Sequence, residues 1–245
     1  MTSLDGKVAV VIGGSSGVGK ATVEALVAAG ARVTAVARDP AKLAGLHGVA
    51  TLAGDATDPA LAERLLGELR PDLVVLALGV TPPIGRVDEL DWESFSAAWN
   101  TDLKASFFFV QQALRLPLRP GSAVVLVSSG AAIAGSPLSG GYAGAKRMQW
   151  LLAGYAQKLS DERKLGLRVV AVLPRQLIEG TTIGARAAAA YGAASGVTAE
   201  AFMKRYEAPL DADQVASAIV TALAGGVAAD VHAIAVTGTG IAPLS

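Results

Sequence analysis

Cysteine is absent from the 245-residue sequence, and histidine occurs only twice, as His47 and His232. The absence of cysteine excludes a disulfide framework, a thiolate nucleophile and a cysteine-ligated metal. The two histidines lie far apart in the sequence, and neither has the spacing of a metal site. We therefore expect no bound metal.

An excess of charge of either sign is also absent, since Lys plus Arg and Asp plus Glu each number 21. This balance gives no reason to expect a nucleic-acid partner. No run reaches the about 18 uninterrupted apolar residues that a membrane span needs. The start, MTSLDGKVAVVIGG, lacks the basic residues and the long apolar stretch of a signal peptide. We expect a soluble, cytoplasmic protein that does not enter a membrane.

The chain is rich in apolar residues, with 52% hydrophobic and 17% charged. Such a composition indicates a sheet buried on both faces, a large subunit interface, or both. Length alone allows one large α/β domain or two small ones. No Pro/Gly/Ser linker, composition break or internal repeat divides the sequence, so we predict a single domain over residues 1–245.

Short β-branched runs alternate with longer helical segments along the chain. Strands are predicted at 7–12, 32–37, 49–53, 73–78, 123–127, 167–173 and 231–236, and helices at 17–29, 59–69, 92–116, 140–163 and 211–223. The almost wholly apolar runs VVLAL and AVVLV are typical of strands buried on both faces. Alternating strands and helices predict βαβ crossovers and one parallel sheet between helical layers.

Two segments interrupt this alternation. Residues 81–91 form a loop after the fourth strand, and residues 178–209 follow the sixth strand with the stretch ARAAAAYGAASG. Long insertions after the carboxyl ends of strands lie where ligands bind in open α/β sheets. An ordinary surface helix and a substrate lid both fit the second segment. Its alanines and glycines permit close packing and motion, which favours a lid at about 178–209.

Three glycines occupy the first strand-to-helix turn, Gly13, Gly17 and Gly19, in the spacing G-x-x-x-G-x-G. Glycine lets a backbone approach a ligand closely, and the following helix offers free N–H groups and a positive dipole end to a phosphate. The spacing differs from Gly-x-Gly-x-x-Gly, and alanine after Lys20 excludes a Walker loop. The position of this turn predicts a pyrophosphate-binding loop.

Tyr142 and Lys146 lie four residues apart at the start of a predicted helix, which places both side chains on one face. An unperturbed tyrosine has a pKa of about 10, and an adjacent ammonium favours the phenolate form. Ser129 ends the fifth strand thirteen residues earlier, so its hydroxyl can converge on the same sheet edge and hold a substrate oxygen. Tyr-x-x-x-Lys alone is common by chance; its combination with Ser129 and the glycine turn is not.

These features resemble the short-chain dehydrogenase/reductase family, in its common single-domain subgroup. The resemblance runs from residue 7 to about residue 240 and is carried by Gly13-x-x-x-Gly17-x-Gly19, Ser129 and Tyr142-x-x-x-Lys146. It implies an α/β fold: a Rossmann-like, doubly wound parallel sheet of seven strands, in the order 3-2-1-4-5-6-7, with helices on both faces.

The resemblance also implies catalytic roles. Tyr142 would be the acid/base that exchanges a proton with the substrate oxygen, and Ser129 would bind that oxygen. Lys146 would tune the tyrosine and hold the nicotinamide ribose. The implied cofactor-binding residues are Gly13, Ser15, Ser16, Gly17, Val18, Gly19, Arg38, Asp55, Ala56, Gly79, Tyr142, Lys146, Pro174 and Leu177.

The end of the second strand indicates which dinucleotide is preferred. Domains selective for NAD(H) usually place an acid there for the ribose 2′-OH, whereas this sequence has Ala37 followed by Arg38. Because arginine pairs well with a 2′-phosphate, NADP(H) is expected over NAD(H). Asp39 is an acid beside this position and would favour NAD(H), unless its role is to cap the helix that begins at Pro40. Asp55 matches the family aspartate that binds the adenine amino group, although a helix-capping role also fits.

The sequence departs from the family at its fourth catalytic residue. The family's asparagine aligns with Asp102, and Asn100 would compete only if the helix were shifted. An aspartate near Lys146 would stabilise the ammonium and raise its pKa. The family's proton relay through a water and Lys146 is therefore not expected to carry over unchanged.

Two other departures concern cofactor contacts. The family's Asn-Asn-Ala-Gly after the fourth strand is Leu-Ala-Leu-Gly here, and only Gly79, which would let the backbone approach the adenine ribose, matches. Arg175 follows Pro174 where the family has glycine. This cation would either approach the nicotinamide or phosphates, or face solvent.

The sequence thus predicts an NADP(H)-dependent oxidoreductase that interconverts a carbonyl and an alcohol on a small molecule. The alternatives are a dinucleotide-binding regulatory protein with vestigial catalysis, and a non-redox isomerase or dehydratase on the same fold. Helices 92–116 and 140–163 carry more apolar residues than one buried stripe needs, which predicts a homotetramer or dimer unless those residues are core. The substrate pocket is expected between segments 81–91, 131–138 and 178–206.

Overall fold

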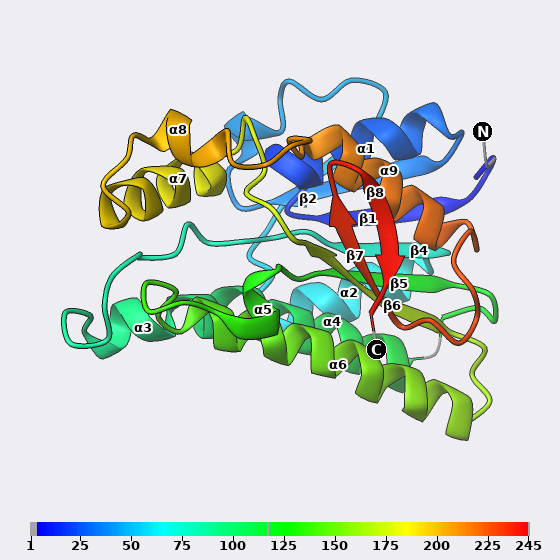
Figure 1. Cartoon of the computed structure of the whole chain (residues 1–245). Coiled ribbons are helices and arrows are strands. Elements are labelled where there is room, and N and C mark those ends of the chain that lie inside the picture. The colour runs from blue at the N-terminus through cyan, green and yellow to red at the C-terminus, as the bar shows by residue number, and fades with distance from the viewer. Residues whose placement is uncertain (1–3, 117, 245) are drawn as a thin grey trace.

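An eight-stranded sheet in the order β3-β2-β1-β4-β5-β6-β7-β8 runs through the computed structural model, which describes residues 4–116 and 118–244 (Figure 1). The strands are β1 (Val8–Ile12), β2 (Arg32–Ala37), β3 (Ala50–Ala53), β4 (Leu73–Leu76), β5 (Ala123–Val127), β6 (Arg168–Pro174), β7 (Ala233–Thr237) and β8 (Gly240–Pro243). The first seven are parallel, in the predicted order.

The prediction of seven strands was one short, because β8 turns back and pairs antiparallel with β7. All four residues of β8 are exposed, and its last residue is Pro243. Proline is confined to edge strands and bulges, so this short segment lacks the apolar pattern by which the other strands were found.

Helices cover both faces of the sheet. They are α1 (Gly17–Ala28), α2 (Pro59–Leu69), α3 (Trp92–Ala98), α4 (Lys104–Arg115), α5 (Ala131–Ala134), α6 (Tyr142–Glu162), α7 (Thr182–Ala194), α8 (Ala199–Met203) and α9 (Ala212–Leu223), with a 3₁₀ turn η1 (Pro40–Lys42) and a π-helical segment η2 (Trp99–Leu103). One core joins the sheet to α1 and α9, and the other joins it to α2, α4 and α6 (Figure 1).

Strand β1 explains why the predicted strands have unbroken apolar sequences. Ala9 and Val11 belong to the core under α1 and α9, whereas Val10 and Ile12 belong to the core on the opposite face. Successive side chains of a strand point to opposite faces, so a strand covered on both sides must be apolar at every position. Within the described residues, no helix is both long and apolar enough to cross a bilayer.

The helix predicted over 92–116 is three consecutive segments, α3, η2 and α4. Two hydroxyl groups bond the backbone there: Thr101 Oγ1 donates to Ala97 O at 2.7 Å, and Ser106 Oγ donates to Asp102 O at 2.7 Å. Such bonds compete with the regular helical pattern, and single π turns are concentrated at functional sites. The widened turn carries Asp102.

The segment after β6 leaves the sheet and returns to it at one point. Ile178 forms a parallel bridge with Leu210, and Glu179 N donates to Leu210 O at 2.8 Å. Helices α7 and α8 lie within this excursion, which projects beyond the sheet beside α1 and α9 (Figure 1).

Candidate functional site

A cavity of about 1000 Å³ opens where the parallel strands end. Its walls include the segments that follow five strands: the glycine turn after β1, 37–39 after β2, 77–79 after β4, 128–130 after β5 and 174–178 at the end of β6. The carboxyl ends of parallel strands lie at one edge of the sheet, where the loops leave a crevice. The topology therefore gathers residues from the whole length of the chain into one site.

Nearly all the residues singled out in the sequence line this cavity. They are Gly13, Ser15, Ser16, Gly17, Val18, Arg38, Asp55, Ala56, Gly79, Asp102, Ser129, Tyr142, Lys146, Pro174 and Leu177. Gly19 is not among the residues that line the cavity. A Cβ at Gly19 would collide with the carbonyl oxygen of Gly13, so this glycine packs the helix against the turn.

The glycine turn is shaped by two positive backbone angles, φ +84° at Gly13 and φ +49° at Gly17. A Cβ at Gly13 would lie 2.6 Å from Leu78 Cα, so the turn packs directly on the segment after β4. Ser16 caps α1 without a side-chain hydrogen bond, and the first turn of α1 has no acidic residue. The N–H groups of this turn are therefore not matched by a side-chain acceptor, as a phosphate site requires.

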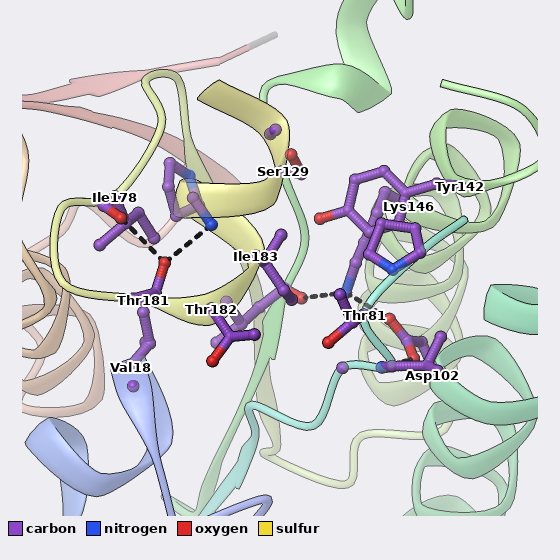
Figure 2. Close-up of a pocket in the computed structure, with 18 of the residues that line it drawn as sticks. Val18, Thr81, Asp102, Ser129, Tyr142, Lys146, Ile178, Thr181, Thr182 and Ile183 are labelled. Carbon is purple, nitrogen blue, oxygen red and sulfur yellow. Dashed lines mark hydrogen bonds and ion pairs between the residues drawn. The ribbon is translucent and has the colours of Figure 1, made fainter. Parts of the chain in front are cut away.

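Ser129, Tyr142 and Lys146 come together at one end of the cavity. Figure 2 shows the Tyr142 phenol oxygen pointing into the cavity, with Ser129 and Lys146 on either side of it. The ammonium of Lys146 lies 5.6 Å from the centre of the Tyr142 ring. Ser129 Oγ accepts a hydrogen bond from Ala131 N at 3.2 Å, which does not use its own proton.

Lys146 and Asp102 form an ion pair at 3.0 Å, with side-chain exposures of 4% and 0%. Lys146 also donates to Val127 O at 3.3 Å, and Asp102 Oδ1 accepts from Val80 N at 2.8 Å. Burial is the largest influence on the pKa of Lys146 and acts to lower it, but Asp102 and Tyr142 together outweigh burial and hold that pKa above its ordinary value. Lys146 is thus a fixed cation beside Tyr142.

Asp102 and Asn100, the two residues considered for the family's asparagine position, differ in their surroundings. Asp102 faces Lys146. Asn100 is exposed, and its side-chain nitrogen donates to Ser96 Oγ at 3.0 Å.

At the other end of the cavity, two acids are engaged by their own loops. Asp39 Oδ1 accepts from Ala41 N at 3.0 Å and caps η1. Asp55 Oδ1 accepts from Thr57 N and from Thr57 Oγ1, both at 2.9 Å, and the backbone bond is the main reason that the pKa of Asp55 is lowered. Arg38, directly before Asp39, also lines the cavity.

One cation that lines the cavity was not singled out in the sequence. Lys42, at the end of η1 and four residues after Arg38, lines the cavity as Arg38 does. Thr181 and Ile183, at the start of α7, lie across the cavity from Lys146 (Figure 2). A Cβ at Gly17 would lie 3.5 Å from Thr181 Cγ2, and one at Gly79 would lie 3.5 Å from Ile183 Cδ1. Both residues lie in segment 178–206, which the sequence analysis places at the substrate pocket, but their packing against Gly17 and Gly79 was not predicted.

Arg175 lies close to the catalytic end of the cavity. It lines the cavity, and a Cβ at Gly130 would lie 2.8 Å from Arg175 Cα. Its backbone therefore abuts the residue after Ser129. No group of three or more His, Cys, Asp or Glu side chains that could hold a metal ion occurs in the described part of the chain.

Comparison with known proteins gives consistent matches. The model of a family described as short chain dehydrogenase matches residues 7–192. The 2,5-dichloro-2,5-cyclohexadiene-1,4-diol dehydrogenase of Sphingobium indicum is 32% identical over 188 residues, which cover 71% of this chain and 74% of that protein. Short-chain dehydrogenase reductase 5 of Arabidopsis thaliana is 27% identical over 194 residues, covering 73% of each.

Solved structures share the fold. Levodione reductase superposes with a TM-score of 0.82 at 21% identity, covering 95% of this chain and 96% of that one. The aldohexose dehydrogenase of Thermoplasma acidophilum superposes with a TM-score of 0.78 at 21% identity, covering 96% and 94%.

Proposed function

Because this chain belongs to the short-chain dehydrogenase/reductase family of oxidoreductases, we propose that it is an NADP(H)-dependent enzyme that interconverts a carbonyl and an alcohol, with Tyr142 as its acid/base. The observation that carries the proposal is the position of Tyr142, one helical turn from the buried Lys146–Asp102 pair in the cavity that the glycine turn also lines. The family binds nicotinamide dinucleotides, and a small-molecule substrate fits a cavity of this size.

The residues of the cavity fit such a cofactor. The turn Gly13–Gly17 and the first N–H groups of α1 would hold the pyrophosphate, since they have no side-chain acceptor of their own. Asp55, Ala56 and Gly79 would contact the adenosine. When bound, the cofactor supplies or accepts the hydride, and the protein's part is to orient the reacting groups and exclude water.

Proton transfer is assigned to the chain's own side chains. Tyr142 would give a proton to the substrate oxygen in reduction and take it back in oxidation, while Ser129 donates a hydrogen bond to the same oxygen. Lys146 places a positive charge beside Tyr142, 5.6 Å from the centre of its ring. Since Asp102 keeps Lys146 protonated, Lys146 acts as a fixed charge and not as a proton carrier.

A screen of ketones and aldehydes with NADPH, read by the absorbance of the reduced cofactor, tests this function. Turnover supports it. Tight NADPH binding without turnover of any carbonyl would favour a regulatory protein instead, and product formation without cofactor consumption would favour an isomerase or dehydratase.

The preference for NADP(H) is assigned to Arg38. We expect Arg38→Ala to weaken NADPH binding by about 10- to 100-fold without comparable harm to NADH, because a charge-assisted bond to the 2′-phosphate is lost. Cofactor fluorescence titration measures both dissociation constants. Arg32→Ala removes the same charge from the opposite end of β2 and is the control. Equal losses for both cofactors would make Arg38 a structural residue.

The excursion over 179–209 is proposed as the substrate lid. Its base is tied by the Ile178–Leu210 bridge, and its middle reaches the loop before α6, where the Tyr191 hydroxyl lies 2.7 Å from Ser136 Oγ. Tyr191 and Ser136 both line the cavity. The contact supports a lid that covers substrate bound beside Tyr142.

We further propose that the protein is a homotetramer or dimer that pairs through α4 and α6. Phe107, Leu151 and Tyr155 are exposed on these adjacent helices, by 44%, 37% and 54%. Apolar groups gathered on neighbouring helices are a common mark of a subunit interface.

Phe107→Glu combined with Leu151→Glu is therefore expected to reduce the mass of the assembly, because two carboxylates would be buried at each interface. Size-exclusion chromatography with light scattering measures that mass. The control is Val87→Glu, on an exposed turn that belongs to neither helix. An unchanged mass in the double variant would rule out this interface.

A further inference from the structure

Gln149 is a completely buried amide on α6, three residues after Lys146. Its side-chain nitrogen donates to Ser106 Oγ at 2.7 Å and to the backbone oxygen of Asp102 at 3.3 Å. Ser106, also completely buried, donates its hydroxyl to the same Asp102 oxygen at 2.7 Å. The carbonyl of Asp102 thus accepts from two side chains on two different helices.

We propose that Gln149 is a positioning residue that fixes η2, through Ser106 and the Asp102 carbonyl, so that the Asp102 carboxylate faces Lys146. Its effect on the ion pair is independent of the reaction, whereas its effect on turnover rests on the proposed function. Nothing in the sequence pattern of α6 points to this role.

Two attachments between the same two elements carry the inference. Helix α6 supplies both Lys146 and Gln149, one turn apart and on the same side. Asp102 contacts both residues: its carboxylate forms the ion pair with Lys146, and its backbone oxygen accepts from the Gln149 side-chain nitrogen. The Asp102 carboxylate also accepts from Val80 N at 2.8 Å and from Thr101 Oγ1 at 3.0 Å through Oδ1. These bonds hold the side chain, whereas Gln149 holds the backbone of the same residue and so sets where η2 places the carboxylate against α6. A buried ion pair needs such geometry, since misaligned charges do not recover their desolvation cost.

A structural role and a positioning role predict different results for Gln149→Leu. Gln149 Oε1 is buried and has no hydrogen-bond partner among the described protein groups. Leucine would remove this unpaired acceptor, and Ser106 would still satisfy the Asp102 carbonyl. We therefore expect Gln149→Leu to keep or raise the Tm while loosening the Lys146–Asp102 pair.

Gln157→Leu is the matched control, because it removes the same group from the same helix. Gln157 is also buried, but it accepts from Val169 N at 2.7 Å and donates to Leu167 O at 3.2 Å, away from the cavity. Its loss should lower the Tm and leave the ion pair intact. Should that variant fail to fold, Ser160→Ala, which removes a buried hydroxyl from the same end of α6, replaces it.

The ion pair can be observed directly by NMR of protein labelled with ¹⁵N-lysine. Ammonium protons exchange rapidly with water unless they are buried and bonded, and the other paired lysines, Lys7, Lys20 and Lys204, are about half exposed or more. We expect one protected ammonium signal, assigned to Lys146 by its loss in Lys146→Met. In Gln149→Leu its exchange should be about 10-fold faster or more, with Ser106→Ala changing in the same direction and Gln157→Leu unchanged.

Turnover provides the second measurement. With any carbonyl that the wild type reduces, Gln149→Leu should lower kcat by about 10-fold, with KM within about twofold, because a small displacement of the charged pair affects the reacting geometry more than binding. Unchanged ammonium exchange in Gln149→Leu, or no protected signal in the wild type, would overturn the proposal. Faster exchange in a protein without any turnover would instead leave Gln149 as a positioning residue and reject the proposed reaction.

Discussion

Replacing Tyr142 with phenylalanine should lower kcat by about 10²- to 10⁴-fold while leaving NADPH affinity within about twofold of wild type. The hydroxyl is the only group lost, and it is the group assigned to proton exchange with the substrate oxygen. The ring remains on α6, and Lys146 keeps its partners Asp102 and Val127. The reaction should therefore slow at the chemical step and not at binding.

Steady-state kinetics and a fluorescence titration with NADPH, made on the same preparations, check this expectation. Tyr155→Phe makes the same change on the outer, exposed side of α6 and keeps the apolar surface there, so its kcat should equal that of wild type. Turnover at the wild-type rate in Tyr142→Phe would remove the proposed mechanism. A large loss of NADPH affinity would instead give the hydroxyl a binding role.

Replacing Asp102 with leucine should lower the free energy of unfolding by about 3–5 kcal/mol, because it leaves the Lys146 ammonium buried without its counter-ion. The double variant Asp102→Leu/Lys146→Met should recover part of that loss, because no buried charge is left unpaired, while Val80 N lacks its acceptor in both variants. Urea unfolding at neutral pH measures both values. If the single variant were as stable as the double variant, the pair would not be buried as described.

The pH dependence of the pair follows from the raised pKa of Lys146. The folded state holds this proton more tightly than the unfolded chain, whose lysines have a pKa of about 10.4. The stabilisation is therefore fully present below that value and is lost as the pH rises through the higher pKa of the folded state. The difference in unfolding free energy between wild type and the double variant should stay constant from about pH 6 to 9 and fall only above about pH 10. A change of that difference within the neutral range would contradict the assignment.

Most of the sheet could be predicted because two-sided burial leaves a clear pattern. Strands such as β4 and β5 are buried at every position and have the sequences LVVL and AVVLV. Strand β8 was not predicted, because its four residues are exposed and so lack the apolar pattern of a buried strand. The break of the helix over 92–116 was not predicted for another reason. The segment contains no proline or glycine, and hydroxyl groups that bond the residue four positions earlier, as Thr101 and Ser106 do, also occur in unbroken helices.

The candidate site likewise contains residues that the sequence could identify and residues that it could not. Tyr142, Lys146 and the glycine turn have fixed local spacings, so the sequence pointed to them. Gln149 follows an arginine and a methionine on α6 and has no such spacing; it is buried because η2 and α4 pack over it. The contribution of Thr181 and Ile183 to the cavity wall arises where α7 crosses the cofactor side of the fold. Contacts between distant elements are a property of the packing, and no local pattern encodes them.

The bridge between Ile178 and Leu210 brings the two ends of a 31-residue segment, 179–209, together at one point beside the sheet. Lengthening or exchanging a loop with anchored ends costs little conformational entropy, about 0.6 kcal/mol for each doubling of its length. We therefore expect that replacing residues 179–209 with a different segment would change substrate specificity, while the strands of the sheet keep their register. If residues 179–209 are the substrate lid, as proposed above, this segment can change substrate choice without a change in the sheet.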